Sequence, residues 1–272
     1  MLSPRQQSLA RQLLETSDGD LERAIEMLRE SQIVKTTKTL KKKYVPSNNE
    51  VIARVTDISK RYKVGKQHVE ALKNVSLHIY KGELLAITGT SGSGKSTLLQ
   101  LIGGLDKPNK GTVEISGQNL AKLRDAKLSS FRNKTIGFVF QFFYLQPFLS
   151  LQSNIEVPAM FARTKTKPRS VTSSELAEDV GIKDRLKHLP RELSGGQMQR
   201  AAIARALQNS PPILLADEPT GNLDSTNAAA IFALFRQICE KQGTTVIVVT
   251  HDLKLAALAD RTIAMSDGEI IT

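Results

Sequence analysis

The sequence predicts an α/β fold built around a parallel sheet. Apolar runs of strand length recur along the chain, and helical patterns separate them. Residues 213–216 and 246–249 are continuously apolar, as strands buried on both faces of a parallel sheet are. Before them, apolar and polar residues alternate over residues 51–55 and 75–79, which predicts two half-buried strands ahead of the buried run at residues 84–87.

The first 33 residues predict a small helical hairpin. Ser3 and Pro4 fit the start of one helix, and Asp20 can cap a second helix with one apolar face. The pattern Gly19-Asp20-Leu21-Glu22-Arg23-Ala24-Ile25, followed by Leu28, resembles the last two helices of a ubiquitin-associated-type fold. A hairpin packed on its own body and a self-association element remain equally open, so no partner is assigned to residues 1–33.

Residues 34–50 predict a basic linker between this hairpin and the main body, which is expected over residues 51–272. Five lysines crowd into the linker: Lys35, Lys38, Lys41, Lys42 and Lys43. A solvated segment that self-repulsion keeps extended is the first interpretation. Attraction to anionic lipid headgroups is the second, and the net charge of +11 keeps nucleic acid as the third.

The composition resembles that of an ordinary soluble globular protein, with 272 residues, 40% of them apolar and 24% charged. No run approaches the roughly 18 to 20 apolar residues that cross a bilayer, and the first residues lack the apolar stretch of a secretion signal. The single cysteine, Cys239, excludes an internal disulfide and most cysteine-based metal sites. A cytosolic location is therefore expected.

A glycine-rich loop follows the run at residues 84–87 and precedes a predicted helix. Its residues are Gly89, Thr90, Ser91, Gly92, Ser93, Gly94, Lys95 and Ser96. In this context the glycines let backbone N–H groups point at phosphate oxygens, beside the positive end of the helix. Lys95 is expected to reach the β- and γ-phosphates of a nucleotide, and the Ser96 hydroxyl to ligate Mg²⁺. The loop predicts a nucleoside triphosphatase without specifying its kind.

Polar residues follow three further predicted strands, at the edge where parallel sheets bind ligands. Asp217 and Glu218 end one strand, where Asp217 is placed to hold Mg²⁺ and Glu218 to activate the attacking water. His251 ends another and could hydrogen-bond the γ-phosphate or that water. Gln141 ends a third and could join the shell of the metal and the nucleophile.

The run Leu193-Ser194-Gly195-Gly196-Gln197 opens another predicted helix. Ser194 and the two glycines leave the N-terminus of that helix exposed, which makes a second anion-binding site. No phosphate-binding loop lies in the same half of the sequence. The arrangement suggests that a second copy of the chain contributes the phosphate.

These motifs, in this order, resemble the nucleotide-binding domain of an ABC transporter over residues 51–272. The matching residues are Tyr62 for the aromatic residue that stacks on adenine, Gly89 to Thr97 for the Walker A loop, Gln141 for the Q-loop, Leu193 to Gln197 for the signature, Asp217 and Glu218 for Walker B, Asp224 for the D-loop and His251 for the switch histidine. The resemblance implies a P-loop NTPase fold with a parallel-sheet core, an antiparallel β subdomain and an α-helical subdomain. It also implies ATP and Mg²⁺ as ligands, and ATP hydrolysis coupled to transport.

In this family two such domains close head to tail, so the resemblance implies a composite site. Ser194, Gly196 and Gln197 then act on the ATP of a second copy, whereas Lys95, Ser96, Gln141, Asp217, Glu218 and His251 act on the chain's own ATP. None of these positions is degenerate in this sequence, which implies two competent sites in a homodimer.

A narrower resemblance connects the chain with the lipoprotein-releasing and macrolide-exporter group. It rests on Ile136-Gly-Phe-Val-Phe-Gln141, Asn154-Ile-Glu-Val-Pro158 and Asp217-Glu-Pro-Thr-Gly-Asn-Leu-Asp-Ser225. Those ATPases pair with a four-helix membrane subunit that carries a large extracytoplasmic domain, which implies a peripheral location on the cytoplasmic face of the cell membrane. Phe142 and Phe143 depart from the polar residue common after the glutamine, so no cargo is implied.

An ATPase that acts on nucleic acid or ribosomes is the main alternative, because of the net charge of +11. Relatives of that kind insert long coiled coils or carry two ATPase domains, and neither feature is visible in the sequence. No specific nucleic-acid partner is therefore expected. A regulatory module that only clamps ATP is a further alternative, against which the intact Glu218 and His251 argue.

Overall fold

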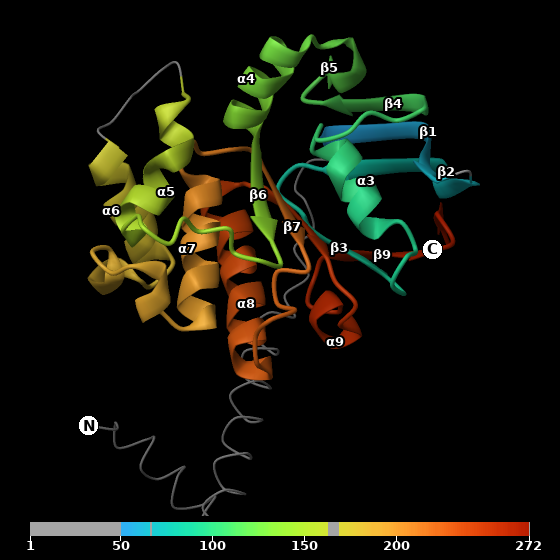
Figure 1. The fold of residues 1–272 in the computed structure, drawn as a ribbon. Coiled ribbons are helices and arrows are strands. Elements are labelled where there is room, and N and C mark those ends of the chain that lie inside the picture. Colours follow the sequence, from blue (N-terminus) through green and yellow to red (C-terminus); the bar gives the residue numbers. More distant parts are fainter. Residues whose placement is uncertain (1–49, 66, 163–168, 272) are drawn as a thin grey trace, which may run out of the picture. The chain divides into compact units, whose positions relative to one another are not determined.

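The computed structural model describes residues 50–65, 67–162 and 169–271, which form the main body (Figure 1). The helical hairpin expected over residues 1–33, and the basic linker expected over residues 34–50 apart from Glu50, lie outside the described residues. Among the residues that are described, no helix is long and apolar enough to cross a membrane.

Four strands form an antiparallel sheet in the spatial order β2-β1-β4-β5. They are β1 (Val51–Val64), β2 (Gln67–Tyr80), β4 (Lys110–Ile115) and β5 (Gln118–Asn119). β1 and β2 are longer than the alternating runs that predicted them. Register shifts on both sides of Ile58 interrupt their pairing, and Asp57 there takes a φ of 47°. Because such bulges break the period of two, the alternation is visible over only part of each strand.

The second sheet has six strands in the order β10-β9-β3-β8-β7-β6. They are β3 (Leu84–Gly89), β6 (Ile136–Phe140), β7 (Ile213–Asp217), β8 (Thr245–Val249), β9 (Arg261–Ser266) and β10 (Glu269–Ile270). All neighbouring pairs are parallel except β9 and β10. The predicted parallel sheet is therefore confirmed, and β3, β8 and β7 lie side by side at its centre.

Helices cover both faces of the parallel sheet (Figure 1). α3 (Lys95–Ile102) lies between the two sheets, in contact with β2 and β4 as well as with β3, β7 and β8. α8 (Ser225–Gln242) and the short α9 (Leu253–Ala256) contact each other and β3. α4 (Asp125–Thr135) leads into β6.

Three helices pack on one another and form the expected α-helical subdomain: α5 (Leu151–Met160), α6 (Arg169–Asp179) and α7 (Gly195–Leu207). Short 3-10 turns complete the described elements: η1 (Leu120–Lys122), η2 (Lys183–Arg185) and η3 (Pro190–Glu192). The fold class implied by the resemblance is thus confirmed in its three parts.

The apolar core consists of two clusters, one on each face of the parallel sheet. Leu215 joins the cluster that includes α3 and the antiparallel sheet. Its chain neighbour Leu214 joins the cluster that includes α5, α6, α7 and α8. Successive side chains of a strand point to opposite faces of the sheet, and here both faces are buried. A central strand therefore needs apolar residues on both faces, which explains the continuous apolar runs in the sequence.

Candidate active site

Neighbouring parallel strands end at one edge of the sheet, beside a cavity of about 660 Å³. Its walls come from residues 69–71 of β2, from most of residues 91–97, and from Gln141, Glu218 and His251. β3 leads into the glycine-rich loop, and β6, β7 and β8 lead into the other three residues. The structure therefore brings together side chains that are far apart in the sequence.

Two glycines in the loop between β3 and α3 are required by its path. Gly94, which precedes α3, has a φ of 99°, and a Cβ on it would lie 2.5 Å from the Ala71 carbonyl oxygen. A Cβ on Gly89 would lie 2.3 Å from the Met265 carbonyl oxygen. The loop can therefore curl over the N-terminus of α3, where backbone N–H groups and the helix dipole favour an anion.

The Lys95 ammonium lies inside this loop, and the residue is only 7% exposed. Its Nζ donates to the carbonyl oxygens of Gly89 at 3.0 Å and Thr90 at 2.7 Å. Both of these acceptors are neutral. Because an ammonium is attracted more strongly to a negatively charged acceptor than to a neutral carbonyl, a phosphate in the cavity would compete well for it.

Ser96 Oγ donates to Asp217 Oδ1 at 2.9 Å, which joins the start of α3 to the end of β7. The pKa of Asp217 is raised, mainly by burial; the hydrogen bond from Ser96 opposes the rise and the charge of Glu218 adds to it. A partly buried carboxylate of this kind gains from a nearby cation. A hydroxyl and a carboxylate oxygen are ligands that suit Mg²⁺, which commonly fills its shell with phosphates and water. The donor set therefore fits Mg²⁺ bound together with a nucleotide.

Glu218 and His251 contact each other across the same cavity. His251 Nδ1 lies 3.0 Å from Glu218 Oε2, and the histidine side chain is 72% exposed. Glu218 has a φ of 46°, a left-handed conformation that few residues other than glycine adopt. Its N–H donates to the Val249 carbonyl oxygen at 3.0 Å, which fixes the residue against β8. Strained backbone of this kind is often found at functional sites, where the surrounding structure maintains it.

Gln141 lines the cavity from the end of β6. Asn222 Nδ2 donates to the Gln141 carbonyl oxygen at 3.0 Å, and a Cβ on Gly221 would lie 2.9 Å from Gln141 Nε2. The segment after β7 therefore packs closely on this glutamine. Sequence reasoning did not single out Asn222 as an anchor, because nothing in the sequence indicates that residues 141 and 222 are neighbours.

Tyr62 does not line the cavity itself among the described residues. It pairs in the β1–β2 ladder with Val69, which does. Its hydroxyl donates to Asp106 Oδ2 at 2.9 Å. Val69, Glu70 and Ala71 line the cavity although sequence reasoning named none of them, since they belong to the part of β2 that shows no alternation.

The residues Ser194, Gly195, Gly196, Gln197 and Asp224 form a second group, which does not line this cavity among the described residues. Ser194 caps α7: its Oγ accepts from the Gln197 N–H at 3.3 Å, and its N–H donates to Gln197 Oε1 at 3.0 Å. Asp224 caps α8 by accepting from the Asn227 N–H at 2.9 Å.

Asn227 connects the two caps of this second group. Its side chain donates to Asp224 Oδ2 at 2.6 Å, and a Cβ on Gly196 would lie 2.8 Å from Asn227 Oδ1. The hydrogen bond from the Asn227 N–H is the main reason why the pKa of Asp224 is lowered. The structure thus gathers the predicted residues into two sets: one around the cavity, and one at the start of α7 and α8.

Comparison with known proteins gives several strong similarities. The model of the family described as ABC transporter matches residues 72–221. The uncharacterized ABC transporter ATP-binding protein YvrO of Bacillus subtilis (strain 168) is 48% identical over 217 residues, which are 80% of this chain and 94% of YvrO. The macrolide export ATP-binding/permease protein MacB of Escherichia coli (strain K12) is 46% identical over 215 residues, which are 79% of this chain but only 33% of MacB.

Solved structures are also similar to this chain in fold and in sequence. The dimeric structure of MJ0796, a bacterial ABC transporter cassette, has a TM-score of 0.75 and 43% sequence identity, and covers 81% of this chain and 97% of MJ0796. A second dimeric structure of MJ0796, in a post-hydrolysis state bound to ADP and Pi, has a TM-score of 0.73 over the same shares of the two chains.

Proposed function

The chain belongs to the ABC transporter family, in which it is an ATP-binding and ATP-hydrolysing subunit, and we propose that two copies close head to tail on ATP to drive a separate membrane subunit. One observation carries the proposed catalytic roles: Ser96, Asp217, Glu218 and His251 meet around the loop that holds Lys95. The same residues supply a phosphate site, two metal-binding oxygens and a base.

The proposed reaction transfers the γ-phosphoryl group of ATP to water and releases ADP and phosphate. The loop amides and Lys95 hold the β- and γ-phosphates, and Lys95 exchanges the carbonyls of Gly89 and Thr90 for phosphate oxygens. Ser96 and Asp217, with Gln141 beside them, would hold Mg²⁺, which neutralises charge on the phosphates. Positioning and electrostatics then provide most of the catalysis.

Glu218 is the proposed general base. Its carboxylate accepts a proton from the attacking water as the oxygen of that water bonds to phosphorus. His251, 3.0 Å away, keeps the carboxylate oriented and can bond the water or the γ-phosphate. The proton leaves Glu218 for the released phosphate, which restores the carboxylate for the next turnover.

The second group of residues supports the proposed dimer. The start of α7, with Ser194 and Gly196, is an anion-binding helix terminus that lies outside the cavity formed by its own chain. MJ0796, which is similar over 97% of its length, is dimeric. We therefore assign Ser194, Gly195, Gly196 and Gln197 to the ATP of the partner copy, with Asp224 beside them at the interface.

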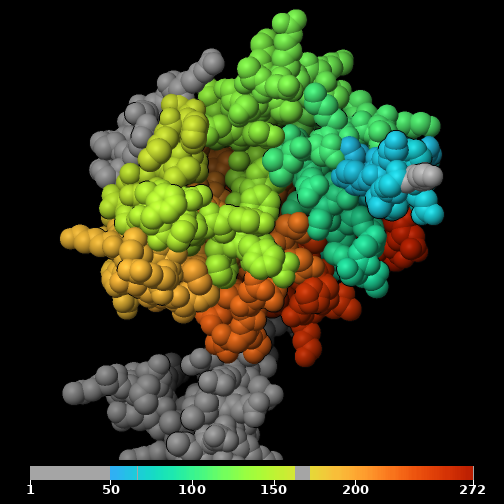
Figure 2. Space-filling model, in the orientation of Figure 1, coloured from blue at the N-terminus to red at the C-terminus, as the bar shows by residue number. Residues whose placement is uncertain are grey.

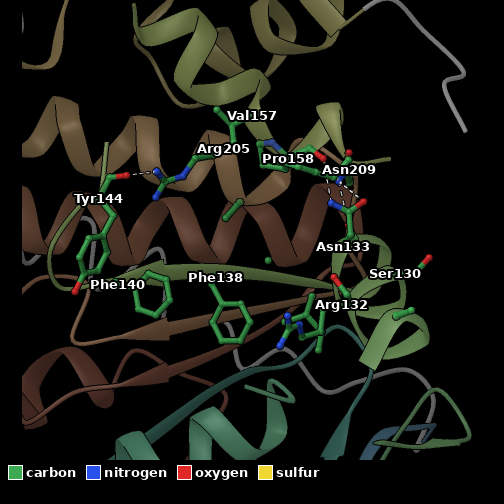
Figure 3. A pocket seen from close by; sticks show the side chains of 16 residues that line it. Ser130, Arg132, Asn133, Phe138, Phe140, Tyr144, Val157, Pro158, Arg205 and Asn209 are labelled. Carbon is green, nitrogen blue, oxygen red and sulfur yellow. Dashed lines mark hydrogen bonds between the residues drawn. The ribbon is translucent and has the colours of Figure 1, made fainter. Parts of the chain in front are cut away.

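A groove next to the active site supports a membrane partner (Figure 3). It has a volume of about 700 Å³, and α4, β6, α5 and α7 form its walls. In Figure 2 the surface is hollowed between the green atoms of α4 and the yellow-green atoms of α5. Two of the aromatic side chains that line it are exposed, Tyr144 and Phe161, and the exposed ring of Phe142 contacts Tyr144. Exposed aromatic side chains beside a groove are typical of a protein-binding site.

We propose that a helical segment of the membrane subunit occupies this groove. MacB is named as an ATP-binding/permease protein, and this chain spans only a third of its length, so in MacB the permease and the ATPase share one chain. We extend the pairing to a separate four-helix subunit with a large extracytoplasmic domain, reached from the cytoplasmic face of the membrane. The basic linker at residues 34–50 is proposed to add contact with anionic lipids.

Arg205 connects the groove with the helix that begins at Ser194 (Figure 3). Its guanidinium donates to the carbonyl oxygen of Tyr144 at 2.6 Å. It also donates to the carbonyl oxygen of Phe143 at 2.7 Å, two residues after Gln141. Movement of a partner in the groove can therefore reach α7 and Gln141 through one side chain. This connection supports the coupling of hydrolysis to work on the membrane side.

Copurification tests the proposed partner. The tagged full chain, solubilised from its own cell membrane, is expected to retain an integral membrane protein of the permease type. Phe161→Ser, in the groove and 74% exposed, is expected to lose it, whereas Val64→Ser, 62% exposed on β1, is expected to keep it. Equal retention by both variants, or copurification with ribosomes or DNA instead, would contradict the proposal.

A further inference from the structure

We infer that Asp106 is a positioning residue for the nucleotide base, because its carboxylate fixes the ring of Tyr62 in the orientation in which that ring stacks on adenine. The inference rests on the stacking role that the family resemblance implies for Tyr62. The Tyr62 hydroxyl donates to Asp106 Oδ2 at 2.9 Å, across 44 positions of sequence. Asp106 belongs to none of the motifs that carry the family resemblance.

The strand register places the Tyr62 ring on the nucleotide side of the sheet. Tyr62 is the direct ladder partner of Val69, and residues directly opposite each other in an antiparallel pair project from the same face. Val69 lines the cavity of the active site and is 51% exposed. The ring therefore stands next to the cavity wall, with its hydroxyl turned to Asp106.

Asp106 is itself held rigidly. Lys60 Nζ donates to Asp106 Oδ1 at 2.7 Å and to the Lys107 carbonyl oxygen at 2.7 Å, and the Lys107 N–H also donates to Asp106 Oδ1 at 2.7 Å. The Lys60 side chain is only 10% exposed. With Oδ1 taken by two donors, Oδ2 remains for the tyrosine.

Lys60 also limits which face of the ring a base can use. Its Nζ lies 5.0 Å from the centre of the Tyr62 ring, within the range of a cation–π contact. The ammonium thus covers one face while the carboxylate fixes the hydroxyl. The other face is the one left for a purine, so the ring meets its base without first losing rotational freedom.

Protonation states favour the same arrangement at neutral pH. Burial raises the pKa of Tyr62, and the hydrogen bond to Asp106 raises it further, so the phenol remains a donor. Burial alone would raise the pKa of Asp106, but hydrogen bonds from Lys60, Lys107 and Tyr62 outweigh it and lower that pKa. The bond therefore joins a neutral donor to a charged acceptor, one of the stronger types of hydrogen bond.

The position of Asp106 also connects the base-stacking ring with the phosphate-binding loop. It lies in the turn that follows α3, and that turn is closed by the Leu105 N–H donating to the Gln100 carbonyl oxygen at 2.9 Å. The N-terminus of the same helix carries the phosphate-binding loop. α3 thus positions the phosphate-binding loop at its start and, through Asp106 just beyond its end, the ring of Tyr62.

Calorimetry of the full chain with MgADP and with magnesium pyrophosphate distinguishes the contribution of the base to binding from that of the phosphates, since pyrophosphate has no base. Tyr62→Phe keeps the ring and removes the donor, and Asp106→Ala removes the acceptor. Each is expected to weaken MgADP by about three- to tenfold, a partial loss of base stacking, and to leave pyrophosphate unchanged. Asp125→Ala, which removes an exposed carboxylate 3.7 Å from Lys107 Nζ, is the matched control and is expected to change neither affinity.

Asp106→Asn keeps one acceptor oxygen for Lys60 and Lys107, and its amide N–H can donate to the Tyr62 hydroxyl oxygen in place of the bond that Oδ2 accepts. It is therefore expected to recover most of the MgADP affinity, which a merely destabilised fold would not do. Equal losses for MgADP and pyrophosphate in Asp106→Ala would overturn the inference, since they would indicate general damage. A loss in Tyr62→Ala with none in Tyr62→Phe or Asp106→Ala would also overturn it, while leaving Tyr62 as the stacking residue. No loss in Tyr62→Ala would remove the stacking role and the inference together.

Discussion

His251 Nδ1 and Glu218 Oε2 lie 3.0 Å apart, although the two residues follow different strands. β7 and β8 are parallel neighbours, with Asp217 opposite Val249, so the residues after them emerge side by side. The left-handed backbone of Glu218 turns its carboxylate toward the histidine. The proposed base therefore has a hydrogen-bonding partner that follows the neighbouring strand.

Replacing Glu218 by glutamine should stop hydrolysis while leaving ATP binding intact. The amide keeps the size and polarity of the carboxylate but accepts no proton from water, so phosphate release should fall by about 10²- to 10⁴-fold. The ATP-bound pair should then accumulate as a dimer in size-exclusion chromatography with MgATP. Glu240→Gln, at an exposed position of α8, is the control and should behave like the unchanged chain. A variant that remains monomeric with MgATP would contradict the head-to-tail model.

The buried ion pair between Arg236 and Asp260 should be essential for stability. Arg236 Nη1 donates to Asp260 Oδ1 at 2.7 Å, and both side chains are at most 5% exposed. Asp260 Oδ2 also accepts from the Leu84 N–H at 2.8 Å, at the start of the strand that leads to the phosphate loop. Asp260→Ala leaves a buried guanidinium without its partner, so the free energy of unfolding should fall by about 3–5 kcal/mol.

Urea denaturation measures this loss. Glu50→Ala is the control, because it breaks an ion pair with Lys81 in which both side chains are more than half exposed, and it should change the free energy of unfolding little. Similar losses in Asp260→Ala and Glu50→Ala would show that burial does not determine the contribution of the ion pair.

The thiol of Cys239 should react only after unfolding. Burial raises its pKa to about 12. An unfolded chain has a thiol pKa of about 8.5, so at pH 8 the thiolate that reacts with maleimide forms mainly in unfolded molecules. Because the folded pKa is the higher one, the stability that this thiol contributes is fully present at neutral pH and is lost as the pH rises toward 12.

Labelling with maleimide at pH 8 checks this, since Cys239 is the only cysteine in the sequence. The rate should be low in buffer and should rise with urea in parallel with unfolding. Fast labelling of the folded chain would show that α8 opens locally around Cys239.

The strands at the centre of the parallel sheet could be predicted from sequence because burial on both faces leaves them continuously apolar. β6 (Ile136–Phe140) ends directly before Gln141, as the sequence predicted. The first part of β2 could not be predicted, because residues 67–70 are all exposed and leave no alternation. That part of β2 supplies Val69 and Glu70 to the wall of the cavity.

The motif residues could be named from sequence because their chemistry depends on short local patterns. Their supporting residues could not. Asp106 and Asn222 act through the distant residues Tyr62 and Gln141, and those contacts depend on how strands and loops meet in the folded chain. A single carboxylate or amide in a loop carries no sign of such a role in the sequence.

Mixing two inactive variants tests the composite site most directly. Lys95→Ala removes the phosphate lysine, and Ser194→Asp keeps a good helix cap but places a negative charge against the phosphate of the partner copy. In a mixed dimer one site combines Lys95 of one copy with Ser194 of the other, so random pairing should restore about a quarter of the unchanged rate of phosphate release. A mixture that stays as inactive as its two components would contradict the proposal that Ser194 acts in trans.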